Sequence, residues 1–139
     1  MNYDATIIPG GSFTWHEYAF LHDWNVLAHP SEIQEQNAIT LFSHLQDIRN
    51  LIKKPIIIRS GARTPEYTAY LRKRGVPAAL HSPHMEWKAV DITIPSMSNK
   101  DLWLFCNDNW KGRLENLHFT PTWVHLDVLQ WGERVRFNP

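Results

Sequence analysis

The segment from Ser31 to Ile52 constrains the fold most strongly, because its apolar residues recur with helical spacing. Ser31 and Gln34 have the Ser-x-x-Gln spacing of a capping box, which marks the first turn of a helix. Beyond that turn, apolar residues recur at steps of three and four positions: Ala38, Leu41, Leu45, Ile48 and Ile52. The pattern predicts one long helix with an apolar face.

Two later segments have the alternating pattern of β-strands. In residues 89–94, Asp91 shares one face with Ala89 and Thr93, and the other face is entirely apolar. Residues 123–129 alternate more cleanly, so His125 and Asp127 project from the same side of one strand. A β-branched run at 55–59 predicts a further, buried strand.

Helices are expected between these strands. Thr64 can cap a helix that has Pro65 at its first position, and Gly75 ends it. Ser98 opens another helix, which runs to about Asn109. The order helix, strand, helix, strand, helix, strand predicts an α+β domain with helices against a small sheet. We expect residues 1–139 to form one such domain.

Composition excludes several classes of protein. The chain is 43% hydrophobic and 20% charged, as in ordinary globular proteins, so disorder is not expected. Its net charge is zero, which gives no sign of a nucleic-acid or anionic membrane partner. No segment has membrane-spanning length, and the N-terminus does not read as a signal peptide, so we expect synthesis in the cytoplasm. The single Cys106 excludes an internal disulfide framework and is expected to be buried in a helix.

Three residues form a candidate metal site. A catalytic zinc ion needs three protein ligands drawn from His, Asp, Glu and Cys, with one position left open for water. His84 in a predicted loop, Asp91 in one strand and His125 in another provide such a set. Asp91 interrupts an apolar strand and would need a partner there, which adds weight to a spacing that is weak by itself.

Three motifs resemble the M15 peptidases in order and spacing. They are Ser60-Gly61-Ala62-Arg63-Thr64-Pro65-Glu66-Tyr67, His81-Ser82-Pro83-His84 through Asp91, and Trp123-Val124-His125-Leu126-Asp127. This family contains D-alanyl-D-alanine carboxypeptidases and L-alanyl-D-glutamate endolysins, and shares a zinc fold with Hedgehog signalling domains. The resemblance covers about residues 12–130 and is closest to short, single-domain phage and prophage members.

The resemblance implies a Hedgehog/DD-peptidase-like α+β fold, with a small antiparallel sheet flanked by helices. His84, Asp91 and His125 match the zinc ligands. Arg63 matches an arginine that faces the substrate, where its guanidinium can stabilise the oxyanion of a tetrahedral intermediate. Peptidoglycan stem peptides or cross-bridges are the implied substrate, and we expect a monomer.

The chain departs from the family pattern at two positions. Many relatives have an acidic general base three residues before the last zinc ligand, where this chain has Thr122. Asp127 or His81 could act as that base, or could orient a ligand. Relatives also usually have glycine at the position of Trp87, so we expect the loop between the first two ligands to bend differently.

Some residues remain open to more than one interpretation. Glu86 and Glu115 are possible bases on charge alone, although their spacing does not favour them. Trp87 and Trp123 are adjacent to predicted ligands and are expected to line a cleft.

The sequence therefore predicts zinc-dependent hydrolysis of a peptide bond in bacterial peptidoglycan, in a phage or prophage lytic role. The protein would act at the cell wall after release or as part of a virion. The first alternative is a zinc-containing binding or virion-structural module without catalysis, which Thr122 favours. The second is an enzyme acting on a free dipeptide or another amide.

Overall fold

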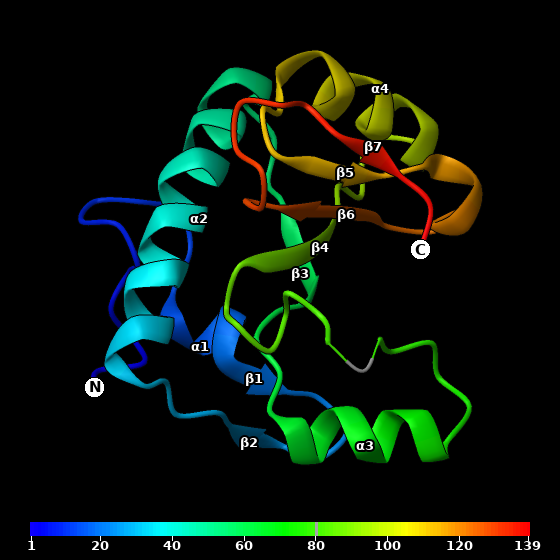
Figure 1. Ribbon diagram of the computed structural model, residues 1–139. Coiled ribbons are helices and arrows are strands. Elements are labelled where there is room, and N and C mark those ends of the chain that lie inside the picture. Colours follow the sequence, from blue (N-terminus) through cyan, green and yellow to red (C-terminus); the bar gives the residue numbers. More distant parts are fainter. Residues whose placement is uncertain (80) are drawn as a thin grey trace.

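A five-stranded sheet with the order β3-β4-β6-β5-β7 forms the centre of the computed structural model, which describes residues 1–79 and 81–139 (Figure 1). The strands are β3 (Ile57–Ser60), β4 (Ala89–Thr93), β5 (Arg113–Glu115), β6 (Val124–Asp127) and β7 (Arg136–Phe137). The first four pair antiparallel, and β7 pairs parallel with β5 at the edge. The predicted α+β class with a small antiparallel sheet is confirmed, with one parallel pair added.

Within the described residues, four α-helices and a short hairpin accompany this sheet. They are α1 (Trp15–Ala19), α2 (Glu32–Ile52), α3 (Pro65–Lys73) and α4 (Asn99–Asn109), with the hairpin strands β1 (Phe20–Leu21) and β2 (Val26–Leu27) and the 3-10 helix η1 (Leu117–Phe119). In the view of Figure 1, α2 runs along one side of the sheet, α4 lies above it and α3 lies below it. None of the helices in the described part of the chain is long and apolar enough to cross a membrane.

The long helix α2 forms as its sequence pattern predicts. Ser31 and Gln34 make both hydrogen bonds of the capping box, and Lys53 ends the helix in a left-handed conformation. The apolar face is buried in the core through Ala38, Leu41, Phe42, Leu45 and Ile48. Burial of each large aliphatic or aromatic side chain contributes about 1.5–3 kcal/mol, so this face holds the helix against the rest of the fold.

Local signals also place α3 and α4. The Thr64 side chain accepts a hydrogen bond from the backbone N–H of Tyr67, and Pro65 occupies the first turn. Ser98 caps α4 in the same way, and Cys106 is buried within that helix as predicted. The four short strands β1, β2, β5 and β7 were not predicted by the sequence pattern.

The end of β3 carries an irregularity that positions the site. The β3–β4 register shifts between Ile58 and Ser60, which brings Ser60 opposite Asp91. Such bulges redirect the side chains that follow them. The next residue, Gly61, packs so closely on α1 that a Cβ atom there would lie 2.2 Å from the carbonyl oxygen of Tyr18. Only glycine fits this position, so the turn leading to Arg63 is fixed against α1.

Candidate active site

Three buried side chains meet on one face of the sheet, as the sequence predicts. Potential ligand atoms of His84, Asp91 and His125 all lie within 4.8 Å of one another. The Oδ1 atom of Asp91 is 3.3 Å from Nε2 of His84 and 2.9 Å from Nδ1 of His125. Asp91 and His125 come together because they are direct partners in the β4–β6 register.

His84 comes from a loop and is held by local hydrogen bonds. The N–H at its Nδ1 donates to the carbonyl oxygen of Gly61 at 2.7 Å, because a carbonyl can only accept. Its backbone N–H donates to the Ser82 hydroxyl at 3.1 Å. The Nε2 lone pair is therefore directed at Asp91. Burial lowers the pKa of His84, which favours the neutral imidazole that binds metals.

Trp87 gives this loop its turn. Its φ of 61° is the left-handed conformation that favours glycine, so the tryptophan has a strained backbone at this turn. Its side chain is 1% exposed and packs edge-on against Tyr18, which compensates for the backbone strain. The prediction that Trp87 lines a cleft is wrong, because the ring belongs to the core.

Asp127 supports His125 from the other side of its ring. The Oδ2 atom of Asp127 accepts a hydrogen bond from Nε2 of His125 at 3.0 Å. The same carboxylate accepts the Nε–H of Arg113, shared between its two oxygens, an N–H from Nη2 of Arg113, and the backbone N–H of Leu129. Asp127 is fully buried, and these donors replace the water that would otherwise stabilise its negative charge.

The carboxylates determine the protonation of this cluster. Burial alone would lower the pKa of His125, but hydrogen bonds to Asp127 and Asp91 together with their charges raise it to about 9. Burial would raise the pKa of Asp91, but the neighbouring His84 and the hydrogen bond from the charged His125 ring hold it below its usual range. The metal-free site at neutral pH thus holds an imidazolium between two carboxylates.

The residues present fit a zinc ion. Two imidazole nitrogens and a carboxylate oxygen form a common catalytic zinc set, with bonds of about 2.0–2.2 Å. Tetrahedral bonds of that length separate ligand atoms by about 3.3–3.6 Å, close to the His84–Asp91 separation of 3.3 Å. The other ring nitrogen of each histidine is hydrogen-bonded to an oxygen, that of Gly61 for His84 and that of Asp127 for His125. Metal-binding histidines usually have such a hydrogen bond.

Arg63 adds a cation beside the cluster. Its Nη2 atom donates to the Ser60 hydroxyl at 2.9 Å and lies 4.0 Å from Oδ2 of Asp91. Its Nε atom is buried and has no hydrogen-bond partner among the described residues. The backbone N–H of Arg63 donates to the carbonyl oxygen of His84 at 3.1 Å. The guanidinium is therefore held in place beside the cluster.

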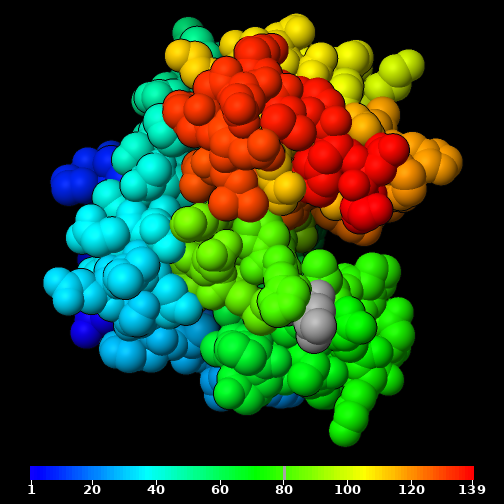
Figure 2. Space-filling view, viewed as in Figure 1, coloured from blue at the N-terminus to red at the C-terminus, as the bar shows by residue number. Residues whose placement is uncertain are grey.

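The cluster opens into a cavity of about 510 Å³. Its lining combines Arg63, the three clustered side chains, Glu115 and the aromatic residues Phe119 and Trp123 with Pro77, Ala78, Ala79 and Pro139. Figure 2 shows a recess between the C-terminal residues, in orange and red, and the green segment that carries α3. Trp123 lines the cavity as predicted. Burial raises the pKa of Glu115, which the sequence named as a possible base on its charge alone.

The other sequence-predicted residues lie elsewhere. His81 is exposed and is not among the described residues that line the cavity, so its predicted role stays a prediction. Thr122 is exposed as well and does not line the cavity. Asp127 lies behind His125 and is not part of the lining.

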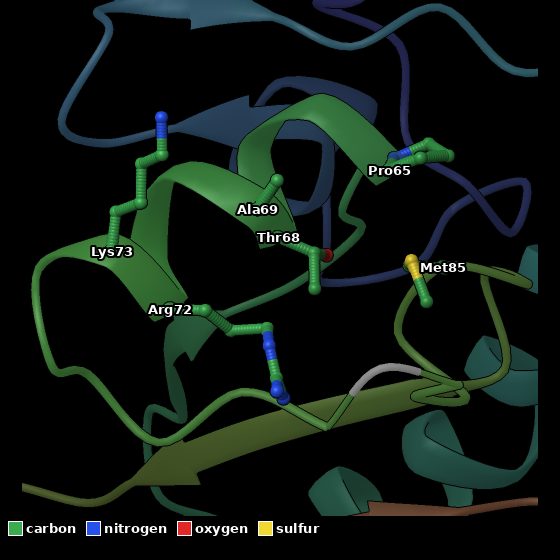
Figure 3. Close-up of a pocket in the computed structure, with 6 residues that line it drawn as sticks. All are labelled: Pro65, Thr68, Ala69, Arg72, Lys73 and Met85. Carbon is green, nitrogen blue, oxygen red and sulfur yellow. The ribbon is translucent and has the colours of Figure 1, made fainter.

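A separate cavity of about 450 Å³ lies along α3 (Figure 3). Arg72 and Met85 lie on opposite sides of it, and the side chain of Lys73 points away from both. It contains none of the predicted site residues. Its lining residues do not form a recognisable catalytic or metal-binding set.

Comparisons with known proteins agree with this geometry. The sequence model of one family, Peptidase M15, matches residues 20–127, a range that contains every predicted site residue. No curated protein and no solved structure matches the chain. The mixed α+β architecture and the buried His–Asp–His cluster are consistent with that family. The chain belongs to the M15 family of metallopeptidases.

Proposed function

We propose that this protein hydrolyses a peptide bond in bacterial peptidoglycan, with a zinc ion bound by His84, Asp91 and His125. The observation that carries this proposal is the buried His–Asp–His cluster at the base of a cavity, in a chain of the M15 family. Zinc supplies Lewis acidity in such sites, where it lowers the pKa of water and polarises a carbonyl.

The residues around the cluster have separate tasks in this proposal. The carbonyl of Gly61 and the carboxylate of Asp127 fix the rings of His84 and His125, so each presents one nitrogen to the metal. Arg63 directs a guanidinium toward the same space. A fixed cation there stabilises the oxyanion that forms when water adds to the scissile carbonyl. Phe119 and Trp123 provide apolar surface for the substrate.

The environment of Asp127 supports the role of orienting His125 over that of a base. Its carboxylate accepts hydrogen bonds from three groups, is fully buried and does not line the cavity. A general base must reach the reacting proton directly or through one water. Asp127 reaches the chemistry through His125.

The test is mass spectrometry of fragments released from purified sacculi by the zinc-loaded protein, with His125→Ala as the control. New stem-peptide or cross-bridge products that are absent from the control would support the proposal and identify the bond. A soluble dipeptide assayed in parallel distinguishes a wall enzyme from a dipeptidase. If zinc binds stoichiometrically and neither substrate is cleaved, the noncatalytic binding module becomes the better interpretation.

The substrate in this proposal determines where the protein acts. Peptidoglycan is reached only at the cell wall, so the protein would act there after release from the cytoplasm or as part of a virion. A lytic role in a phage or prophage is part of the same proposal, and it is tested by lysis of host cells on expression together with a holin.

A further inference from the structure

One row of residues crosses the sheet at the site. Asp91 in β4 pairs with His125 in β6. Strand β5 pairs with β6 from its other side, with Arg113 opposite Asp127 and Leu114 opposite Leu126. One residue further along the same register, Glu115 lies opposite His125. Directly paired residues project from the same face with Cβ atoms about 4.5–5.5 Å apart, so Glu115 projects beside His125 on the metal-binding face.

The backbone of Glu115 is fixed while its carboxylate is free. Its carbonyl oxygen accepts a hydrogen bond from the Trp103 indole at 2.9 Å, and the residue pairs with Phe137 of β7. Its side chain lines the cavity and is half-buried. None of the hydrogen bonds among residues 1–79 and 81–139 involves this carboxylate, so it remains available to a molecule in the cavity.

The other acidic residues near the site already have partners, and Thr122 lies outside the cavity. Asp91 is one of the clustered ligands, and Asp127 is occupied by Arg113 and His125 behind the cavity. Thr122 is exposed, outside the described lining, and its hydroxyl does not accept a proton at neutral pH. Among the described side chains of the lining, Glu115 has the one carboxylate without a partner.

We infer that Glu115 is the general base of the reaction, an inference that rests on the proposed function. Its carboxylate takes a proton from water while the water oxygen bonds to the scissile carbonyl carbon, and Arg63 stabilises the oxyanion. When the C–N bond breaks, Glu115 passes that proton to the leaving nitrogen. The products are a carboxyl and an amino group, and Glu115 returns to its ionised form.

The test compares Glu115→Gln with Glu115→Asp on a soluble stem peptide. Glutamine keeps the shape but cannot take the proton, so we expect kcat to fall by at least about 100-fold with KM changed by less than about threefold. Glu115→Asp should recover part of the lost kcat. Glu133→Gln is the matched control, because Glu133 is exposed and outside the cavity lining, and it should keep full activity.

Two further readouts do not depend on turnover. Zinc affinity, measured by competition with a chromophoric chelator, should be the same in wild type and Glu115→Gln. The metal-free forms of both proteins should bind the uncleaved stem peptide with the same Kd. Weaker zinc binding would make Glu115 a ligand, and weaker peptide binding with kcat retained would make it a substrate-positioning residue. Either result overturns the inference.

The failures of the two proposals are distinguishable. A wild type that cleaves while Glu115→Gln cleaves equally well overturns the inference and leaves the proposed function standing. A zinc-loaded wild type that cleaves neither sacculi nor stem peptide overturns both.

Discussion

The ring of His125 is held by Asp127 two residues away on the same strand, with 3.0 Å between Nε2 and Oδ2. Because Asp127 is in turn paired with Arg113 of β5, the charge that orients the ring is fixed by a neighbouring strand. The Nδ1 atom of His125 is thereby presented to Asp91 and to the metal site.

This relationship predicts the effect of Asp127→Asn. The amide loses the negative charge that fixes the ring and leaves Arg113 without its ionic partner, so zinc affinity should fall by about 10- to 100-fold. Competition with a chromophoric chelator measures the change. Asp108→Asn is the control, because Asp108 is exposed at the end of α4. Equal affinities in the two variants would contradict the orienting role.

Removal of the Arg63 guanidinium should separate catalysis from metal binding. In Arg63→Ala we expect kcat on the stem peptide to fall by about 10²- to 10³-fold, because a donor to the oxyanion is lost. The metal content, measured by atomic absorption, should stay at that of the wild type. Arg59→Ala serves as the comparison, since Arg59 is exposed and donates to Thr93 instead. Loss of zinc in Arg63→Ala would assign the arginine to the stability of the cluster.

Zinc binding should depend on pH through His125. Its pKa in the metal-free protein is about 9, and the metal has to displace that proton. Apparent zinc affinity should therefore rise about tenfold per pH unit from pH 7 toward pH 9 and level off above it. Calorimetry in buffers of different ionisation enthalpy should show about one proton released per zinc at pH 7. A pH-independent affinity would contradict this protonation state.

The raised pKa of His125 should also make the metal-free protein less stable as the pH rises. The folded pKa of His125 lies above its unfolded value of about 6.5, so the folded state binds more protons between these values. The stabilisation is fully present below about pH 6.5 and is lost as pH rises through about 9. Urea unfolding of the metal-free protein across this range measures the change, and stability that rises with pH would contradict it.

Gly61→Ala should damage both stability and metal binding. The added Cβ would meet the carbonyl oxygen of Tyr18 at 2.2 Å, so the backbone has to move, at about 1–3 kcal/mol. That movement displaces the Gly61 carbonyl from Nδ1 of His84. Gly10→Ala is the comparison, because Gly10 has a positive φ but open space around it. Only Gly61→Ala should weaken zinc binding in the chelator assay.

Much of the site could be predicted because its signals are local. The alternation in residues 123–129 placed His125 and Asp127 on one face, and the structure confirms that placement. Asp91 stood out because it interrupts an apolar strand. The caps at Ser31, Thr64 and Ser98 set the starts of three helices without reference to the rest of the fold.

The remaining features depend on contacts between distant segments. Strand β5 has three residues, too few for alternation to distinguish it from a loop. Arg113 was therefore not predicted at the site, and Glu115 was named as a possible base only on its charge. Their positions follow from the register with β6. The burial of Trp87 likewise depends on Tyr18, which is far away in the sequence. Sequence spacing carries no information about such pairings.

Two hydrogen bonds join His84 to Gly61 and Arg63. They hold together the two ends of the segment that carries α3. Loop-closure entropy grows slowly with length, so insertions between these ends change the stability little. The segment contributes Ala78 and Ala79 to the cavity wall but none of the clustered ligands. Changes to the cavity-facing residues of this segment can therefore alter which peptide is accepted while the clustered ligands keep their places.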